Sequence, residues 1–185
     1  EVTGYAANDD LMGRLRRTWS ETVLVDLLDD SLARAARDHL IDQGFLRSRV
    51  EVLLDHPEPD VIRARLHIDS GPRSPSRTFE FSGNRAIPSA VLQEVASSND
   101  LDADPWKDPD PLLAEIQATY AAKGYLAARA TAGRVEFSNG AATLPIRVEE
   151  GPAARIASVE LTGVPSERRQ GARAAVALPA GSPFA

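Results

Sequence analysis

Residues 120–125 read Tyr-Ala-Ala-Lys-Gly-Tyr, and the related segment Asp-Gln-Gly-Phe occupies residues 42–45. Gly124 and Gly44 lie 80 residues apart, and each follows an apolar stripe at helical spacing, so both fit the left-handed position that ends a helix. Two further pairs of glycines keep the same separation: Gly71 with Gly151, and Gly83 with Gly163. A constant period at three landmarks indicates that one small module is duplicated along the chain.

The repeat also sets the limits of each copy. Residues 1–4, Glu-Val-Thr-Gly, match residues 80–83, Glu-Phe-Ser-Gly, at a separation of 79, so the chain begins inside the first strand of a module. We therefore expect a first module over residues 1–73 with a truncated first strand, a complete module over residues 74–154, and the beginning of a further module over residues 155–185.

Each copy opens with a strand and a short helix. In the second copy Phe79 and Phe81 alternate with polar residues, which is the period-two pattern of a strand with one buried face. Asn84 follows Gly83 and turns the chain. Pro88 then fits the first position of a helix. The apolar stripe of this helix comprises Val91, Leu92 and Val95.

A second helix and a hairpin complete the copy. Asp110 is suited to cap this helix, with Pro111 as its first residue. Its apolar stripe comprises Leu112, Ile116 and Tyr120. We place the first hairpin strand at residues 126–137, and at residues 46–55 in the first copy. Pro145 removes a backbone donor from the last strand, so we expect a bulge or a local loss of pairing there.

The order of elements predicts the fold class. Three strands and two helices form a two-layer unit, because a sheet with one apolar face must bury it against another element. We predict an α+β fold of tandem β-α-α-β-β modules, each a three-stranded mixed sheet packed under two helices. Modules of this size lie near the lower limit for independent folding, so an adjoining copy would help them.

Composition and charge exclude several classes of protein. Of the 185 residues 43% are hydrophobic and none is cysteine, and the net charge of −6 is spread along the chain. Dispersed acidic charge argues against a nucleic-acid partner, and the lack of cysteine excludes disulfides and thiolate chemistry. The sequence has no apolar run of eighteen residues, and its start lacks the pattern of a secretory signal. We therefore expect neither a membrane-spanning helix nor a targeting peptide in it.

No pattern of residues predicts catalysis, a metal site or a cofactor. The acidic run between residues 100 and 110 lacks the glycine and glutamate spacing of a calcium loop. Glu149 and Glu150 are adjacent in a strand and point to opposite faces, so they cannot flank one substrate bond. The three histidines lack metal-ligand spacing, and we expect surface positions for all of them: His39, His56 and His67. We therefore expect a protein that is not an enzyme.

Four segments of the second copy together form a specific signature: residues 79–84 (Phe-Glu-Phe-Ser-Gly-Asn), 87–92 (Ile-Pro-Ser-Ala-Val-Leu), 120–125 and 148–152 (Val-Glu-Glu-Gly-Pro). In this order and spacing the chain resembles the polypeptide-transport-associated (POTRA) domains of the BamA and TamA outer-membrane assembly family. The motif positions are Gly83, Asn84, Tyr120, Gly124, Tyr125, Glu150 and Gly151, with Gly44, Gly71 and Gly163 in the other copies. The first copy departs from the motif, because it has Tyr5 for the asparagine and Phe45 for the second tyrosine.

The resemblance implies a role in protein transport. Such modules form a string in the periplasm ahead of a C-terminal membrane β-barrel, so the chain would be the periplasmic portion of an outer-membrane protein. The implied partners are unfolded outer-membrane polypeptides and accessory periplasmic or lipoprotein subunits, without nucleic acid or cofactor. Two alternatives stay open: a purely structural spacer that sets distance and orientation between barrel and partners, and the POTRA region of a two-partner secretion transporter.

In the resembled family the strand after the Gly-Tyr pair lies at an edge of the sheet. An open edge offers unpaired backbone groups to an extended polypeptide, so we expect a client to bind there by β-augmentation. The candidate binding residues are Leu126, Ala128, Arg129, Ala130, Thr131, Ala132 and Gly133. Trp19 and Trp106 are compatible with either core packing or contacts between modules.

Overall fold

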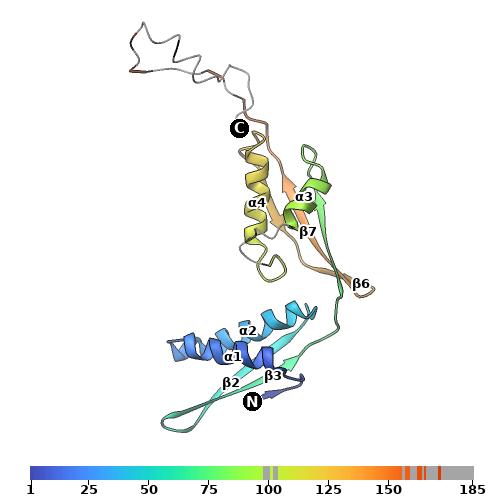
Figure 1. Cartoon of the computed structure of the whole chain (residues 1–185). Coiled ribbons are helices and arrows are strands. Elements are labelled where there is room, and N and C mark those ends of the chain that lie inside the picture. The colour runs from blue at the N-terminus through green and yellow to red at the C-terminus, as the bar shows by residue number, and fades with distance from the viewer. Residues whose placement is uncertain are drawn as a thin grey trace. The chain divides into compact units, whose positions relative to one another are not determined.

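The computed structural model of the chain describes residues 1–97, 101, 104–155, 157–158, 162–163, 165 and 171. The chain separates into two compact units, Glu1–Thr78 with Val135–Thr143, and Phe79–Arg134 with Leu144–Ala185 (Figure 1). The further module predicted over residues 155–185 lies almost entirely outside the described residues, so the predicted module boundaries stay a prediction. None of the helices in the described ranges has the length and apolar character needed to span a bilayer.

The first module has one sheet and two long helices. Its elements are β1 (Val2–Thr3), α1 (Asp9–Glu21), the 3₁₀ turn η1 (Val25–Leu27), α2 (Leu28–Asp42), β2 (Arg49–Glu58) and β3 (Val61–Asp69). The strand order is β1-β3-β2. β1 runs parallel to β3, with Val2 opposite Leu66, and β2 runs antiparallel to β3, with Val52 opposite the same leucine. Figure 1 shows α1 and α2 side by side against this sheet.

The second module repeats this order. Its elements are β4 (Ser76–Ser82), α3 (Ser89–Ala96), α4 (Asp110–Ala121), β5 (Arg129–Ala132), β6 (Glu136–Ser138) and β7 (Ala141–Glu149). β7 is central, with β4 on one side and the antiparallel β5 and β6 on the other. Thr78 lies beside Thr143 and Gly83 beside Val148, so β4 and β7 run in the same direction. Two mixed sheets, each with a pair of helices, confirm the predicted α+β class.

The strand predicted over residues 126–137 is broken into β5 and β6, which gives the second sheet four strands in place of the predicted three. Leu126 lies in a turn before β5, and Gly133 begins the break. Gly133 donates its N–H to the Pro145 carbonyl at 2.8 Å, but Pro145 has no N–H to return. A Cβ on Gly133 would also lie 2.9 Å from the Pro145 ring. The proline therefore interrupts the ladder where we expected a loss of pairing.

In the second module α3 begins one residue later than predicted, and α4 begins one residue earlier. Pro88 has extended backbone angles (φ −58°, ψ 144°) and precedes α3, where its carbonyl accepts the N–H of Val91. Asp110 is the first residue of α4 rather than its cap, so Pro111 is the second. A carboxylate does accept a backbone N–H at this end, but it belongs to Asp108, which binds the Asp110 N–H at 3.1 Å.

The hydrophobic residues predicted from helical and strand spacing form the cores. In the first module the buried cluster joins both helices to the central strand: Leu11, Leu15, Leu28, Leu32, Ala36, Leu40, Leu66 and Ile68. In the second module the largest buried side chains are Ile87, Leu92, Leu112, Ile116, Tyr120 and Ile146. Each core therefore lies between one helix pair and one face of one sheet.

The glycines after the second helices act alike in both copies. Gly44 (φ +92°) and Gly124 (φ +88°) adopt the left-handed conformation predicted from the sequence. Their carbonyls accept the N–H groups of Ser74 and Ala154, at 2.8 and 2.7 Å. Because these acceptors and donors are also 80 residues apart, the two modules share this contact as a consequence of the duplication.

A second pair of glycines lets the chain approach the central strand. Gly4 (φ +81°) and Gly83 (φ +80°) follow the first strand of each module, and a Cβ at either position would overlap a backbone carbonyl oxygen. The oxygen belongs to Ile68 in β3 and to Val148 in β7. Only glycine meets both requirements, the positive φ and the absence of a side chain.

Substitution of Gly83 by alanine tests this close approach. Gly83 and Gly140 have nearly equal φ angles (+80° and +79°), so alanine carries similar backbone strain at both, about 1 kcal/mol. Nothing lies within 4 Å of a Cβ placed on Gly140. We expect Gly83→Ala to lower the free energy of unfolding by at least about 2 kcal/mol more than Gly140→Ala, as measured by urea denaturation. Equal losses would contradict the close approach.

Candidate functional site

The strand order leaves β2 and β5 at the edges of their sheets. Among the described residues, no strand pairs with the outer side of either. β1 and β4 form the opposite edges. The strand that follows each helix-ending glycine therefore has a row of backbone groups without a strand partner.

Hydrogen bonds of the central strand show which groups of β2 face outward. Leu66 donates its N–H to the Glu1 carbonyl at 2.8 Å, and the Ala64 carbonyl accepts the Glu1 amino group at 2.8 Å, so both face β1. In an antiparallel pair, positions that exchange hydrogen bonds alternate with positions that do not. The residues of β2 opposite Leu66 and Ala64 therefore turn their N–H and C=O groups toward open space. With the same alternation, the outward-facing residues of β2 are Val50, Val52 and Leu54.

The same reasoning applies to β5. Gly133 donates to Pro145, so the residue pair at this position is turned toward β7. Counting back along the register with β7, the residues whose backbone groups face outward are Ala132 and Ala130. β5 therefore offers two such residues, whereas the longer β2 offers three.

The structure gathers only part of the predicted binding set into a strand. Of the seven residues, four form β5: Arg129, Ala130, Thr131 and Ala132. Leu126 is exposed in the preceding turn, Ala128 is buried between that turn and the strand, and Gly133 follows the strand. The side chains of Arg129 and Thr131 are exposed, and that of Ala130 is buried. The outer face of β5 is thus polar and its inner face is packed.

Glu150, immediately after β7, joins three segments of the second module. Its Oε1 accepts the hydroxyl of Tyr120 at 3.0 Å and the backbone N–H of Ala86 at 2.6 Å. Tyr120 lies near the end of α4 and is fully buried, and Ala86 lies in the loop before α3. Burial, together with the adjacent Glu150 carboxylate, raises the pKa of Tyr120 well above its usual range. We call Tyr120, Glu150 and Ala86 the tyrosine latch.

Two further motif residues support the tyrosine latch. The side-chain amide of Asn84 donates to the Ile87 carbonyl at 3.0 Å and to the Ser89 hydroxyl at 2.9 Å, which fixes the turn that leads into α3. Tyr125 packs edge-to-face on Tyr120, with ring centroids 5.9 Å apart. Sequence reasoning named Glu150 as a motif position and as one of two adjacent acids, but did not predict its hydrogen bonds. Its role as a double acceptor depends on segments that are distant in sequence.

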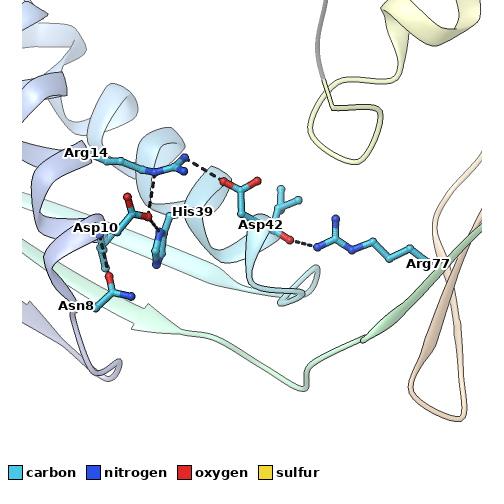
Figure 2. Close-up of polar contacts among 8 residues, drawn as sticks. Asn8, Asp10, Arg14, His39, Asp42 and Arg77 are labelled. Atoms are coloured by element: carbon cyan, nitrogen blue, oxygen red, sulfur yellow. Dashed lines mark hydrogen bonds and ion pairs between the residues drawn. The ribbon is translucent and has the colours of Figure 1, made fainter. Parts of the chain in front are cut away.

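The first module replaces the latch with a different polar contact. Leu40 and Ser70 stand at the positions of the latch tyrosine and glutamate, 80 residues earlier. Figure 2 shows instead His39 of α2 facing Asp10 of α1, with Nδ1 2.9 Å from Oδ2. The guanidinium of Arg14 also lies 3.4 Å from this carboxylate. This contact joins the start of α1 to α2, as Asn84 and the latch hold the start of α3.

The expected surface position of His39 is wrong, because the side chain is fully buried. His39 lies three residues after the buried Ala36 and therefore on the inner face of α2. The rings of Tyr5 and His39 meet edge-to-face at 6.4 Å, and those of Tyr5 and Phe45 at 6.1 Å. The two departures of the first copy from the motif thus pack in one aromatic cluster. The other two histidines, as expected, are exposed.

Figure 2 also shows two contacts at the end of α2. Arg14 pairs with Asp42 at 3.0 Å, and the guanidinium of Arg77 donates to the Ile41 carbonyl. Both contacts lie within one compact unit. They fix the last turn of the helix next to Gly44, where backbone carbonyls would otherwise lack partners.

The acidic connection before α4 has local structural roles. Asp104 accepts the N–H of Trp106 at 3.0 Å, in addition to the Asp108 contact described for α4. Trp106 packs on Phe79 at a centroid distance of 5.4 Å, whereas Trp19 is partly exposed. The other two members, Asp100 and Asp102, lie outside the described residues. Over the residues that are described, no cluster of three or more metal-binding side chains is present.

Comparison with known proteins gives structural neighbours only. No family model matches the sequence, and no curated protein matches it. Similar solved structures include POTRA regions and other parts of BamA and Omp85 proteins. They include POTRA domains 3–5 of BamA from Haemophilus influenzae (17% identity, TM-score 0.48), BamA of Haemophilus ducreyi lacking POTRA domains 1–3 (13%, 0.47) and the N-terminal domain of Omp85 from Thermosynechococcus elongatus (15%, 0.48).

The alignments cover 84%, 80% and 98% of this chain, and 63%, 28% and 77% of those chains. The chain therefore spans less than two thirds of either BamA chain. At these identities and TM-scores, the fold assignment rests on the element order and strand register of the chain itself.

Removal of the Tyr120 hydroxyl tests the tyrosine latch. In Tyr120→Phe the Glu150 carboxylate keeps only the Ala86 N–H, so we expect a loss of about 1–3 kcal/mol in the free energy of unfolding, measured with urea. Tyr125→Phe is the matched control, since no hydrogen bond of the Tyr125 hydroxyl is found among the described residues. We expect a change within about 0.5 kcal/mol for it. Similar losses in both variants would contradict the latch.

The raised pKa of Tyr120 predicts a loss of stability in alkali. The folded chain holds this proton more tightly than the unfolded chain, in which tyrosine has its ordinary pKa of about 10. As the pH rises above that value, the unfolded state binds fewer protons than the folded state, so stability falls. We expect the free energy of unfolding to fall by up to about 1.4 kcal/mol per pH unit more in wild type than in Tyr120→Phe. Identical pH profiles would refute the assignment.

Proposed function

We propose that the chain belongs to the periplasmic POTRA region of an outer-membrane β-barrel assembly or translocation protein, and that its open sheet edges bind unfolded outer-membrane polypeptides by β-augmentation. The observation that carries this proposal is the row of outward-facing backbone groups on β2 and β5. Such groups bind an extended chain through its backbone, so they tolerate many client sequences.

The motif residues support the POTRA part of the proposal. In the second module the turn before α3 is fixed by Asn84, and the latch ties that turn to α4 and to the end of β7. Gly83 and Gly124 meet backbone requirements that other residues would not meet. The residues that carry the resemblance therefore have structural reasons to occur together, and their order along the chain follows the order of the elements.

The shape of β2 supports client binding. It is ten residues long, it is antiparallel to β3 over most of that length, and its register shifts only near the hairpin end, between Asp55 and Glu58. A strand of ten residues can pair along its edge with an extended segment of about ten residues. Accessory periplasmic or lipoprotein subunits, and a membrane β-barrel that follows in the full-length protein, complete the proposed assembly.

The short β5 favours a second candidate function for its module. Four residues with two outward-facing positions are a small template, and the break at Pro145 prevents its extension. A structural spacer sets the distance between the barrel and its partners, and this role does not require a long edge strand. We therefore assign client binding first to β2 and treat the second module as the place where the spacer alternative is to be tested.

Proline substitution on β2 tests client binding. Val52→Pro removes an N–H that faces open space and leaves the bonds between β2 and β3, whereas Val52→Ala shortens the same side chain and keeps the N–H. The probe is a ten-residue peptide of alternating apolar and polar residues, as in a membrane β-strand. We expect this peptide to shift the amide resonances of β2 in wild type and Val52→Ala. In Val52→Pro we expect an affinity at least about tenfold lower.

The corresponding change in the second module is Ala132→Pro, which adds little bulk and also removes an outward-facing N–H. Circular dichroism checks that each variant is folded. Equal peptide affinities for Val52→Pro and Val52→Ala would exclude β-augmentation at β2. If Ala132→Pro also binds the peptide more weakly, clients are assigned to both modules. If Ala132→Pro binds the peptide as wild type does, the second module remains a spacer.

A further inference from the structure

The loop between α1 and α2 of the first module exposes a run of apolar side chains. Val23 is 91% exposed, Leu24 62%, Val25 45% and Leu27 51%. We call residues 23–27 the apolar loop. Single exposed apolar residues are ordinary, but a contiguous group of this kind marks an interaction surface.

The fold itself does not require the apolar loop. The connection at the same place in the second module, residues 97–109, is acidic, and its tryptophan turns inward to pack on Phe79. One copy of the module thus packs the largest apolar side chain of this connection on its own strand, while the other leaves four apolar side chains exposed. The difference indicates that the first module uses this loop for a contact outside itself.

Charge around the apolar loop identifies the chemistry of that contact. Between Ser20 and Ala33 the chain has no lysine or arginine and has four carboxylates: Glu21, Asp26, Asp29 and Asp30. Over the described part of the chain, none of these carboxylates forms an ion pair. The apolar loop is therefore flanked along the chain by four carboxylates that have no ion-pair partner among the described residues.

A hollow of about 520 Å³ adjoins the apolar loop between the end of α1 and the first turns of α2. Leu27 contributes an apolar wall, and Glu21, Asp30 and Asp38 contribute carboxylates. Arg34 is the single cationic side chain of the lining. A long aliphatic side chain with a positive end would meet both kinds of surface, because its stem can lie on the apolar wall while its charge meets the carboxylates.

We propose that the apolar loop and this hollow form a docking surface for a segment of a partner protein that presents apolar side chains flanked by lysine or arginine. This surface is separate from the open edge of β2 and does not depend on client binding there. A second copy of the chain fits less well, since a twofold contact would bring the four carboxylates against each other. An anionic lipid surface would be repelled by the same carboxylates.

Peptide titration of the whole chain tests this proposal. The probe is a twelve-residue peptide of alternating leucine and lysine pairs, and the control peptide has glutamate for each lysine. We expect the lysine peptide to cause saturable amide shifts confined to residues 21–38, and to bind at least tenfold less tightly to the Val23→Ser, Leu24→Ser double variant. Glu21→Gln with Asp30→Asn should weaken binding several-fold and reduce its dependence on salt.

Val61→Ser is the matched control, because Val61 is also exposed (41%) but lies at the β2–β3 hairpin. We expect it to bind the lysine peptide as wild type does. Shifts outside residues 21–38, or equal binding of the glutamate peptide, would overturn the proposal. So would sedimentation showing self-association that requires Leu24, which would assign the loop to a second copy, or binding to neutral vesicles that requires it, which would assign the loop to a lipid surface.

Discussion

The central strand of each module, β3 or β7, must be hydrogen-bonded on both sides, and the rest of the fold follows from this requirement. The first strand pairs with it in parallel, which obliges the chain to cross over one face through two helices before it returns. The hairpin partner then has only the far side available. Its own outer side is left open, so the edge available to another polypeptide is a product of the topology and needs no special side chains.

The two modules hold this arrangement with shared backbone contacts and different side chains. Gly4 and Gly83 approach the central strand in the same way, because no other residue fits there. The start of the first helix is fixed by Asp10 and His39 in one copy and by Asn84 with the tyrosine latch in the other. Backbone geometry allows one solution at the glycines, whereas a polar contact between helices can be built from several pairs of side chains.

The sequence was informative where a local rule applies and silent where distant groups meet. Helix-ending glycines, apolar stripes and the effect of Pro145 follow from backbone geometry within a few residues, and the structure agrees with them. The buried position of His39 was not predicted, because its contact with Asp10 joins two helices and no local pattern of residues shows it. The two hydrogen bonds that Glu150 accepts were missed for the same reason. The break between β5 and β6 was anticipated in kind, but not in its effect on the length of the edge.

Pro145 also bears on the rate at which a bound segment would leave the β5 edge. If each main-chain hydrogen bond to a bound segment contributes about 1 kcal/mol, an edge with two outward residues releases an extended chain faster than an edge with three, and affinity differences of this kind appear mainly in the dissociation rate. In the proposed client binding, one proline in a central strand would thus shorten the residence of a segment on the neighbouring edge. Repeated modules with unequal edges would pass an unfolded chain onward by rebinding rather than retain it at one point.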